Sequence, residues 1–448
     1  MRFKAVIALL TMSTISMAQG VIDVHSHIIT PEFLSALESE GRLMDEGFPL
    51  PKYNAEAHLK WMDEAGVQTS VLTLAAPQPE SAQVVRSTNE AAAQLKQEHP
   101  DRFLFCAALP LPDVDAAIRE AVYALDTLKA DGIKLATNVQ GQYLGAPELD
   151  TLFSVLNERK AVVILHPHRP EPVNPQVMQQ TPLAMQEYLS ETTRAVSNMI
   201  SRNVLARYSN VKVVVPHCGA YLPLSVPRMK SLAPVMQANK MVGNIDWDAN
   251  LAALYYDLAG AHSPEVIRML LTITTPDHLL YGSDYPYVAP QVLTQSLQRM
   301  RQYLAAEPDL APFREMILHK NAEWLMGRSQ TKADVNTNGG NMICRLAEIE
   351  VYPEHLAEYL SYANEVDRLS VERESGVVCL FPMQSAEDST KIRILEIYAS
   401  EQAYQQHLKT DHFLRYKQGT LHMVKSLSLP TMLPLDPDAM RLIFKKQR

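Results

Sequence analysis

Short apolar runs alternate with amphipathic stretches between residues 20 and 327, and this alternation constrains the fold more than any other feature. The apolar runs are residues 21–24, 67–74, 103–108, 132–135, 161–165, 211–215, 254–257 and 279–282. Stretches between them, such as 55–64, 114–128, 148–159 and 183–208, show helical spacing, with Asn54 and Asp113 expected as helix N-caps and Gly66 and Gly132 as helix ends. Strands that alternate with helices pair in parallel, so eight repeats predict an α/β fold, a (β/α)8 TIM-like barrel.

Histidines and one aspartate follow four of these runs. His25 and His27 come after the first run, His166 after the fifth, His217 after the sixth and Asp284 after the eighth. In such a barrel the functional side chains gather at the carboxyl ends of the strands, so these residues are expected to converge on one mouth. Buried imidazoles and carboxylates lower stability unless something binds them. Three or more histidines with one aspartate are the ligand set of a catalytic divalent metal, which predicts a metal-dependent enzyme.

A second unit is expected after the barrel. Residues 328–341 are polar and rich in Gly and Asn, which is typical of a linker. Within residues 342–440, strands are expected at 342–351, 377–383, 392–399 and 424–429, and helices at 354–373 and 401–409. The order strand, helix, strand, strand, helix, strand predicts a smaller ferredoxin-like α+β domain.

Composition restricts the partners and the compartment. The net charge of −9 and the lack of a dense Lys/Arg block argue against a nucleic-acid partner. Beyond the N-terminus no segment approaches the roughly 20 apolar residues of a membrane span. Arg2 and Lys4 precede a mostly apolar run with small residues at its end, which is typical of a signal peptide over residues 1–18. Cleavage would give a periplasmic or secreted protein, whereas an uncleaved N-terminus would leave the protein in the cytoplasm.

Residues 20–327 resemble a known family. The segments that carry the resemblance are VIDVHSHI, MDEAGV, RFLFCAALPL, GIKLATNVQG, VVILHPH, ETTRAVSNMI, VVVPHCGAYLP, YYDLAG and LLYGSDYP. They are similar to the amidohydrolase-related family, which includes aminocarboxymuconate semialdehyde decarboxylase and the resorcylate and carboxyvanillate decarboxylases. The resemblance implies that His25, His27, His166 and Asp284 bind one divalent metal, usually Zn²⁺ and in some relatives Mn²⁺. It also implies that His217 stays off the metal and acts as general acid/base.

The substrate, by this resemblance, is a small molecule that carries a carboxylate. In relatives an arginine before the MDEAGV-like segment binds that carboxylate. No arginine matches here, and Lys52 and His58 are the substitutes for it. His168 has two interpretations, a contact with the substrate or with His217, and a cap on its own loop. Lys134 is interpreted as a packing residue of the barrel or a charge at its rim.

Three further residues near the predicted site have interpretations. Asp23 and Tyr285 are candidates for orienting the ligand rings. Cys218 follows His217 directly and would be the nucleophile of a cysteine enzyme. Because adjacent residues of an extended segment point to opposite faces, Cys218 is instead interpreted as a small buried residue.

Residues 374–416 resemble the antibiotic biosynthesis monooxygenase (ABM) domain. The matching segment is ESGVVCLFPMQSAEDSTKIRILEIYASEQAYQQHLKTDHFLRY. Such domains usually join sheets in dimers, which implies a homodimer, and some oxidise quinols or aromatic compounds without a cofactor. Residues 395–398 read LEIY where relatives often carry tryptophan, which favours a dimerisation and lid module over an oxygenase. His407 and His412 need not share a helix face and are not expected to bind metal.

Several functions fit these observations. Nonoxidative decarboxylation of an aromatic or enoic carboxylic acid and hydrolysis of a lactone, ester or amide suit the same metal and fold. The segments ETTRA and HCGAYLP resemble the decarboxylase branch more closely, which favours decarboxylation. A binding protein whose barrel has lost its chemistry predicts missing ligands, yet all are present. The remaining alternative places a cofactor-independent monooxygenase activity in the second unit.

Overall fold

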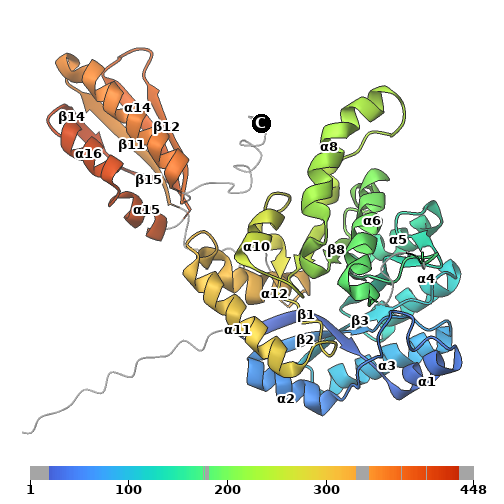
Figure 1. Ribbon diagram of the computed structural model, residues 1–448. Helices are drawn as coiled ribbons and strands as arrows, with labels where there is room; N and C mark the ends of the chain where they lie inside the picture. The colour runs from blue at the N-terminus through green and yellow to red at the C-terminus, as the bar shows by residue number, and fades with distance from the viewer. Residues whose placement is uncertain are drawn as a thin grey trace, which may run out of the picture. The chain divides into compact units, whose positions relative to one another are not determined.

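The computed structural model describes residues 20–174, 176, 181–328, 343–374, 376–399 and 401–432. The expected signal peptide, most of the expected linker and the chain beyond residue 432 lie outside these ranges. Contacts between Cα atoms divide the chain into two compact units (Figure 1). The first unit ends at residue 330 and the second begins at residue 331, and each is described by itself. Within the described ranges, no helix is long and apolar enough to cross a membrane.

Eight parallel strands form the sheet of the first unit, in the order in which they occur in the chain. They are β1 (Val21–Ile28), β2 (Val67–Leu74), β3 (Phe103–Ala108), β4 (Gly132–Ala136), β7 (Val162–His166), β8 (Lys212–Val215), β9 (Leu254–Asp257) and β10 (Leu279–Leu280). The chain after β10 returns to β1, because Ser26 and Tyr285 form a parallel bridge. The backbone N–H of His27 also donates to the carbonyl of Tyr285 at 2.7 Å. The predicted TIM-like barrel is therefore confirmed.

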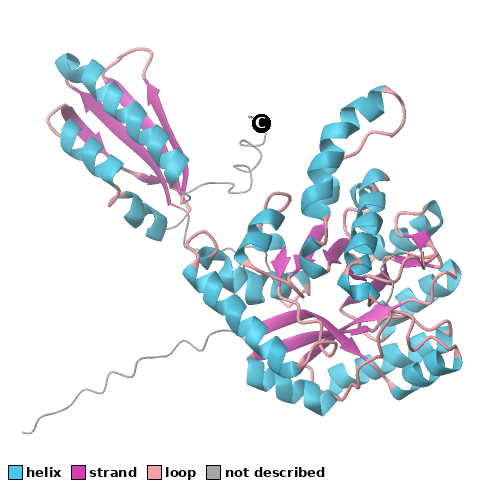
Figure 2. Cartoon of the chain, viewed as in Figure 1, coloured by secondary structure: helices cyan, strands magenta, loops and turns pink. Residues whose placement is uncertain are grey.

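Helices surround these strands (Figure 2). The α-helices are α1 (Pro31–Ser39), α2 (Ala55–Ala65), α3 (Ala82–Glu98), α4 (Val114–Val122), α5 (Asp150–Glu158), α6 (Glu187–Ser201), α7 (Val204–Arg207), α8 (Leu222–Ala238), α9 (Trp247–Ala252), α10 (Pro264–Leu270), α11 (Pro290–Ala306) and α12 (Asn321–Leu325). Shorter helical turns are η1 (Tyr123–Thr127), η2 (Pro147–Leu149), η3 (Leu183–Met185), η4 (His217–Gly219), η5 (Pro276–His278), η6 (Ala311–Phe313) and η7 (Met316–Lys320). A small hairpin joins β5 (Asn138–Val139) and β6 (Gln142–Tyr143).

Local sequence signals explain where some elements begin and end. The side chains of Asn54 and Asp113 each accept a backbone N–H of the first helical turn, at 2.8 and 2.9 Å, as expected. Gly66 ends α2 with φ of 72°, a conformation that favours glycine. The expectation for Gly132 was wrong, because this residue begins β4 rather than ending a helix. A Cβ atom there would lie 2.5 Å from the carbonyl oxygen of Val162 on the neighbouring strand.

The interior of the barrel is apolar below its mouth. Side chains from seven of its strands form one buried cluster there, which includes Ile22, Val24, Val71, Leu104, Cys106, Ile164, Val214, Tyr255 and Leu280. A larger apolar layer separates the strands from the surrounding helices, with Trp61, Phe103 and Phe153 among its buried rings. Burial of each such large side chain contributes about 1.5–3 kcal/mol, so the two layers hold the strands rigidly. Polar groups at the mouth are thus carried by a rigid scaffold.

The second unit is an antiparallel sheet with helices. It comprises β11 (Ile343–Val351), η8 (Pro353–His355), α14 (Leu356–Arg373), β12 (Val377–Gln384), β13 (Lys391–Tyr398), α15 (Glu401–His407), α16 (Asp411–Thr420), β14 (Val424–Ser428) and β15 (Thr431–Met432). The strand order is β12-β13-β11-β14, and β15 pairs with β11. Alternate residues of β11 pack on Tyr359 and Ala363 of α14. This arrangement confirms the predicted ferredoxin-like domain, with α16 as a helix that the sequence analysis missed.

Candidate metal centre

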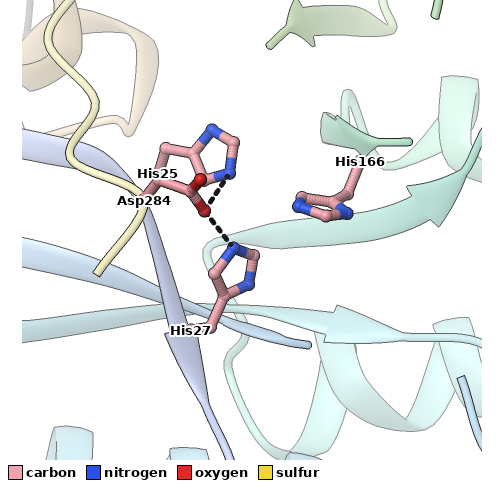
Figure 3. A group of neighbouring side chains, drawn as sticks. All are labelled: His25, His27, His166 and Asp284. Carbon is pink, nitrogen blue, oxygen red and sulfur yellow. Dashed lines mark hydrogen bonds and ion pairs between the residues drawn. The ribbon is translucent and has the colours of Figure 1, made fainter. Parts of the chain in front are cut away.

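Four predicted ligands meet at the mouth of the barrel. His25 and His27 lie within β1, which continues to Ile28, rather than beyond a strand that ends at residue 24. Two residues apart on one strand, their side chains point to the same side. His166 is the last residue of β7, and Asp284 lies in the loop after β10. One ligand atom from each of the four residues lies within 4.8 Å of the others (Figure 3).

Hydrogen bonds fix which ring nitrogen of His25 and His166 carries a proton. The Nδ1 atom of His25 lies 2.8 Å from Oδ2 of Asp257, at the end of β9. The Nδ1 atom of His166 lies 2.9 Å from the carbonyl oxygen of Pro167, which can only accept. Both Nδ1 atoms therefore donate, and both Nε2 atoms keep a lone pair.

His27 has the same tautomer for a different reason. Its Nδ1 atom lies 3.0 Å from the hydroxyl oxygen of Thr73. That hydroxyl donates its own hydrogen to the carbonyl of Ser26, also at 3.0 Å. Because the hydroxyl has only one hydrogen, it accepts from Nδ1 of His27. The three rings thus present three Nε2 lone pairs.

Two of these lone pairs, on His25 and His27, face a carboxylate oxygen instead of a hydrogen-bond donor. Nε2 of His27 lies 3.1 Å and Nε2 of His25 lies 3.5 Å from Oδ1 of Asp284. The His25 atom is buried and has no hydrogen-bond partner. Lone pairs directed at a carboxylate oxygen repel it unless a positive charge lies between them. Three imidazole nitrogens and one carboxylate oxygen fit a divalent metal that can take up a substrate by expanding its coordination to five.

The pKa values of the three histidines and of Asp284 also indicate that the cluster binds a cation. Burial lowers the pKa of His27 to about 4 and that of His166 well below its usual value. Burial acts against the charged form of His25 as well, yet Asp257 and Asp284 raise the pKa of His25 to about 9, so that without a metal a proton on Nε2 would take the place of the cation. Burial raises the pKa of Asp284, but the imidazole rings of His217, His27 and His25 beside it hold that pKa well below its usual range. The two carboxylates therefore attract one cation to the cluster, and a divalent ion satisfies all four ligands at once.

Asp284 is held in place by its own backbone and by Asp23. Its φ is 65°, and its backbone N–H donates to the carbonyl of His25 at 2.8 Å. Asp23 accepts the backbone N–H of Ser283 at 2.9 Å and the hydroxyl of Ser283 at 2.6 Å. Asp23 and Tyr285 were expected to orient ligand rings, but their hydrogen bonds join backbone segments of the mouth. The residue that orients the ring of His25 is Asp257.

His217 lies beside the ligands rather than among them. Its Nε2 atom is 3.8 Å from Oδ2 of Asp284, and its ring centre is 5.1 Å from that of His25. Oδ1 of Asp257 accepts its backbone N–H at 3.0 Å, so one aspartate positions both His25 and His217. The Nδ1 atom of His217 is buried without a hydrogen-bond partner. An imidazole in this position can exchange a proton with a bound molecule.

The structure separates the two candidate substrate-binding residues. Lys52 is exposed, and none of the hydrogen bonds or ion pairs in the described part of the chain connects it to the ligands. His168 is 4% exposed and lies close to the cluster, two residues after His166. Its Nε2 atom accepts the backbone N–H of Gln78 at 3.2 Å. Its backbone N–H donates to the hydroxyl of Thr137 at 3.0 Å, which holds the loop.

Cys218 has the properties of an unreactive cysteine. It is buried, its thiol points to the carbonyl of Ala259 at 3.6 Å, and burial raises its pKa well above the usual value. A thiol with a raised pKa holds little thiolate at neutral pH, so it is a poor nucleophile.

A second group of histidines and a carboxylate occurs in the second unit. His407, His412 and Glu374 each offer one atom within 4.8 Å of the others. Nδ1 of His407 lies 2.9 Å and Nε2 of His412 lies 2.6 Å from Oε1 of Glu374. Both rings donate to the same oxygen, so this group closes on itself by hydrogen bonds.

The barrel matches a known protein family. The model of the amidohydrolase family matches residues 22–328, which is more than half of the chain. The chain belongs to the amidohydrolase family. Residues 342–419 of this amidohydrolase match the model of the antibiotic biosynthesis monooxygenase domain, as the sequence analysis predicted.

Characterised relatives of this amidohydrolase are decarboxylases. Decarboxylase yanB of Aspergillus niger is 32% identical over 343 residues, which cover 71% of this chain and 91% of the relative. The 6-methylsalicylic acid decarboxylase of Penicillium expansum is 30% identical over 276 residues, which cover 59% of this chain and 84% of the relative. A crystal structure of dihydroxybenzoic acid decarboxylase from Polaromonas, with bound manganese and 2-nitroresorcinol, has a TM-score of 0.58 at 18% identity. The superposition covers 70% of this chain and 98% of the Polaromonas chain, and the two share the same fold.

Proposed function

We propose that the barrel is a metal-dependent, nonoxidative decarboxylase of an aromatic carboxylic acid. The observation that carries this proposal is the convergence of three Nε2 lone pairs and Oδ1 of Asp284, with the ring of His217 beside them. The decarboxylase relatives, one of which acts on 6-methylsalicylic acid, support the choice of reaction and of substrate class. A bound divalent ion would hold the substrate oxygens and withdraw electron density from them.

His217 is proposed to carry the proton of the reaction. In a decarboxylation of this kind, a proton is added to the ring carbon that bears the carboxylate. The bond between the two carbons then breaks, its electron pair returns to the ring, and carbon dioxide leaves. Asp257 fixes the backbone of His217, and the side chain of His217 lies 3.8 Å from Asp284, so its ring stays at the edge of the ligand cluster. General acid catalysis of this type typically contributes 10²–10⁴-fold.

The metal is proposed to be Zn²⁺, with Mn²⁺ as the alternative. Three imidazole nitrogens and one carboxylate suit Zn²⁺, because harder cations prefer ligand sets made of oxygen. The manganese in the Polaromonas structure supports Mn²⁺ for a protein of the same fold. Removal of metal with a chelator, followed by reloading with either ion, compares their activities directly. Higher turnover with Mn²⁺ than with Zn²⁺ would reverse the assignment.

The reaction is tested with a substrate panel. Metal-loaded full-length protein is incubated with hydroxybenzoates and, separately, with aromatic and aliphatic lactones and esters. We expect carbon dioxide release from at least one hydroxybenzoate and none of the hydrolysis that the alternative function requires. Ring opening of lactones without carbon dioxide release would overturn the proposal in favour of a hydrolase. Oxygen consumption with quinols, unchanged in a His217→Ala variant, would instead place an activity in the second unit.

Two further proposals concern assembly and location. A homodimer is proposed from the resemblance of the second unit to ABM domains, and light scattering on the full chain tests it. Export is proposed from the residues at the N-terminus, with a cytoplasmic location if the segment is retained. Determination of the N-terminal residue of the mature protein decides between these outcomes.

A further inference from the structure

Three buried polar atoms close to the metal ligands have no partner inside the protein. They are Nζ of Lys134, Nδ1 of His168 and Oε1 of Glu46. The three residues are 1%, 4% and 2% exposed. A buried polar atom without a hydrogen bond typically destabilises the folded protein by about 1–3 kcal/mol. Glu46 and His168 lie side by side, with Oε1 of Glu46 3.6 Å from Nε2 of His168, and Lys134 lies on the strand next to that of His166. Unsatisfied atoms in this part of the barrel indicate a site for a polar ligand.

The strand register places Lys134 in the barrel interior, and not in the packing layer outside it. Lys134 in β4 pairs with Ile164 in β7, and Ala136 pairs with His166. Ile164 belongs to the interior cluster, and His166 points to the rings of β1. Paired residues of parallel strands point to the same side, so Lys134 points inward as well.

The hydrogen bond from Gln78 determines which ring nitrogen of His168 carries the proton. Nε2 of His168 accepts the backbone N–H of Gln78 at 3.2 Å, so Nε2 carries no proton in the neutral ring. The proton lies on Nδ1, which is therefore a donor without an acceptor. Lys134 and His168 together supply hydrogen-bond donors that no oxygen of the described residues accepts.

Glu46 and Tyr188 connect these donors with the metal ligands. The hydroxyl of Tyr188 donates to Oε2 of Glu46 at 3.0 Å, and the ring of Tyr188 packs edge-on against His166 at 5.9 Å. Oε1 of Glu46 lies 3.6 Å from Nε2 of His168, too far for a hydrogen bond. Glu46 adds an acceptor, so the site combines donors for an anionic oxygen with an acceptor for a hydroxyl group.

We propose that Lys134 and His168 bind a second oxygen substituent of the substrate ring, a phenolic or carboxylate oxygen, while the carboxylate to be removed binds at the metal. Glu46 accepts the hydrogen of a neighbouring hydroxyl where the substrate has one. The inference rests on the proposed decarboxylase function and narrows its substrates to aromatic acids with such an oxygen. Lys134 is then a residue that determines specificity, and not a packing residue.

The test measures binding, so it does not depend on turnover. Binding of benzoate, salicylate and phthalate to metal-loaded protein is measured by calorimetry for the wild type and for Lys134→Met. A hydrogen bond to a charged group changes affinity by about 10- to 100-fold. We expect the wild type to bind salicylate or phthalate about 10- to 100-fold more tightly than benzoate. In Lys134→Met this preference should be lost. A larger loss of affinity for salicylate identifies the bound oxygen as phenolic, and a larger loss for phthalate identifies it as a carboxylate oxygen.

Lys320→Met is the matched control. Lys320 is also buried, but it belongs to η7, next to His319, which contacts the carbonyl of Gly20 before the start of β1. This is the opposite end of β1 from His27, so Lys320→Met is expected to keep the preference. An unchanged preference in Lys134→Met, with metal content equal to that of the wild type, would overturn the inference. Absence of carbon dioxide release with the preference intact would overturn only the proposed reaction.

Discussion

The barrel and the second unit each bring histidines and a carboxylate together, but the two groups differ in their hydrogen bonds. In the barrel, every Nδ1 donates to an oxygen outside the group, so Nε2 of His25 and Nε2 of His27 both face Asp284, and only an added cation or proton satisfies them. In the second unit, both rings direct their donors at Glu374. The barrel group therefore needs an added positive charge at its centre, whereas the second group is already satisfied by its own protons.

This difference shows that residue types alone do not define a metal site. Both groups contain ligands that bind transition metals, and both include buried histidines. What separates them is the surrounding acceptors, such as Asp257 and Thr73, which fix the proton on the far nitrogen of each ring. We therefore expect substitutions in the barrel group to change metal binding or turnover, and substitutions in the second group to change stability alone.

Loss of the His217 ring is expected to have the largest effect. His217→Ala should retain metal, because His217 is not among the four ligands, and should lower turnover by about 10²–10⁴-fold. Metal content and carbon dioxide release measured on the same preparation check both parts. His412→Ala in the second unit is the control and should keep full turnover. A His217→Ala protein that keeps turnover would remove this residue from the reaction.

Loss of the Thr73 hydroxyl, which accepts the hydrogen bond from Nδ1 of His27, should weaken metal binding. Thr73→Val keeps the shape of the side chain and removes the hydroxyl that fixes the tautomer of His27, so metal affinity should fall about 10- to 100-fold. Thr69→Val is the matched control on the same strand, where the hydroxyl bonds to the carbonyl of Asp101 instead. Competition with a chromophoric chelator measures both affinities. Equal affinities in the two variants would show that the tautomer is not set by Thr73.

In the second unit, Glu374→Ala should lower stability and leave metal content unchanged. It leaves the buried ring of His407 and the ring of His412 without an acceptor, which should reduce the free energy of unfolding of this unit by about 1–3 kcal/mol. Glu372→Ala removes an exposed carboxylate that pairs with Arg368 on α14, and serves as control. Calorimetric unfolding of the full chain resolves the two effects. Loss of a bound metal in Glu374→Ala would contradict the distinction between the two groups.

The last expected effect is a pH dependence of the stability of the second unit. Burial, with a contribution from Glu396, raises the pKa of Asp367 from 3.8 to about 7. Between these values the folded state holds a proton that the unfolded chain releases, so the stability of this unit falls as pH rises from about 4 to about 7. The slope is at most about 1.4 kcal/mol per pH unit, and stability is level above that range. Asp367→Asn should reduce the slope in unfolding experiments across this range, and an unchanged slope would exclude Asp367 as its source.

Much of the fold follows from the sequence because strand and helix periodicities are local. The eight runs of apolar residues predicted the eight barrel strands, and the capping side chains of Asn54 and Asp113 predicted two helix starts. The helix α16 was missed although Thr410 caps it, because its ten residues are mostly polar. Local patterns therefore predict the elements that are rich in apolar residues and miss this polar one.

The candidate ligands could be proposed from sequence, but their hydrogen-bond partners could not. His25 and Asp257 are 232 residues apart, and only closure of the barrel brings them together. The sequence did contain a signal for Asp257, an acidic residue at the end of an apolar run, as for Asp284. For Lys134, the sequence could not distinguish packing from a place in the interior, because this depends on the register between β4 and β7.

Metal content per chain, measured by mass spectrometry on full-length protein after loading with Zn²⁺ and dialysis, tests the distinction between the two groups most directly. Three proteins are compared: the wild type, His166→Ala, and a His407→Ala/His412→Ala double variant. We predict about one zinc per chain in the wild type and the double variant, and almost none in His166→Ala. Zinc retained by His166→Ala, or a second zinc that disappears in the double variant, would contradict the assignment of the metal to the three lone pairs of the barrel.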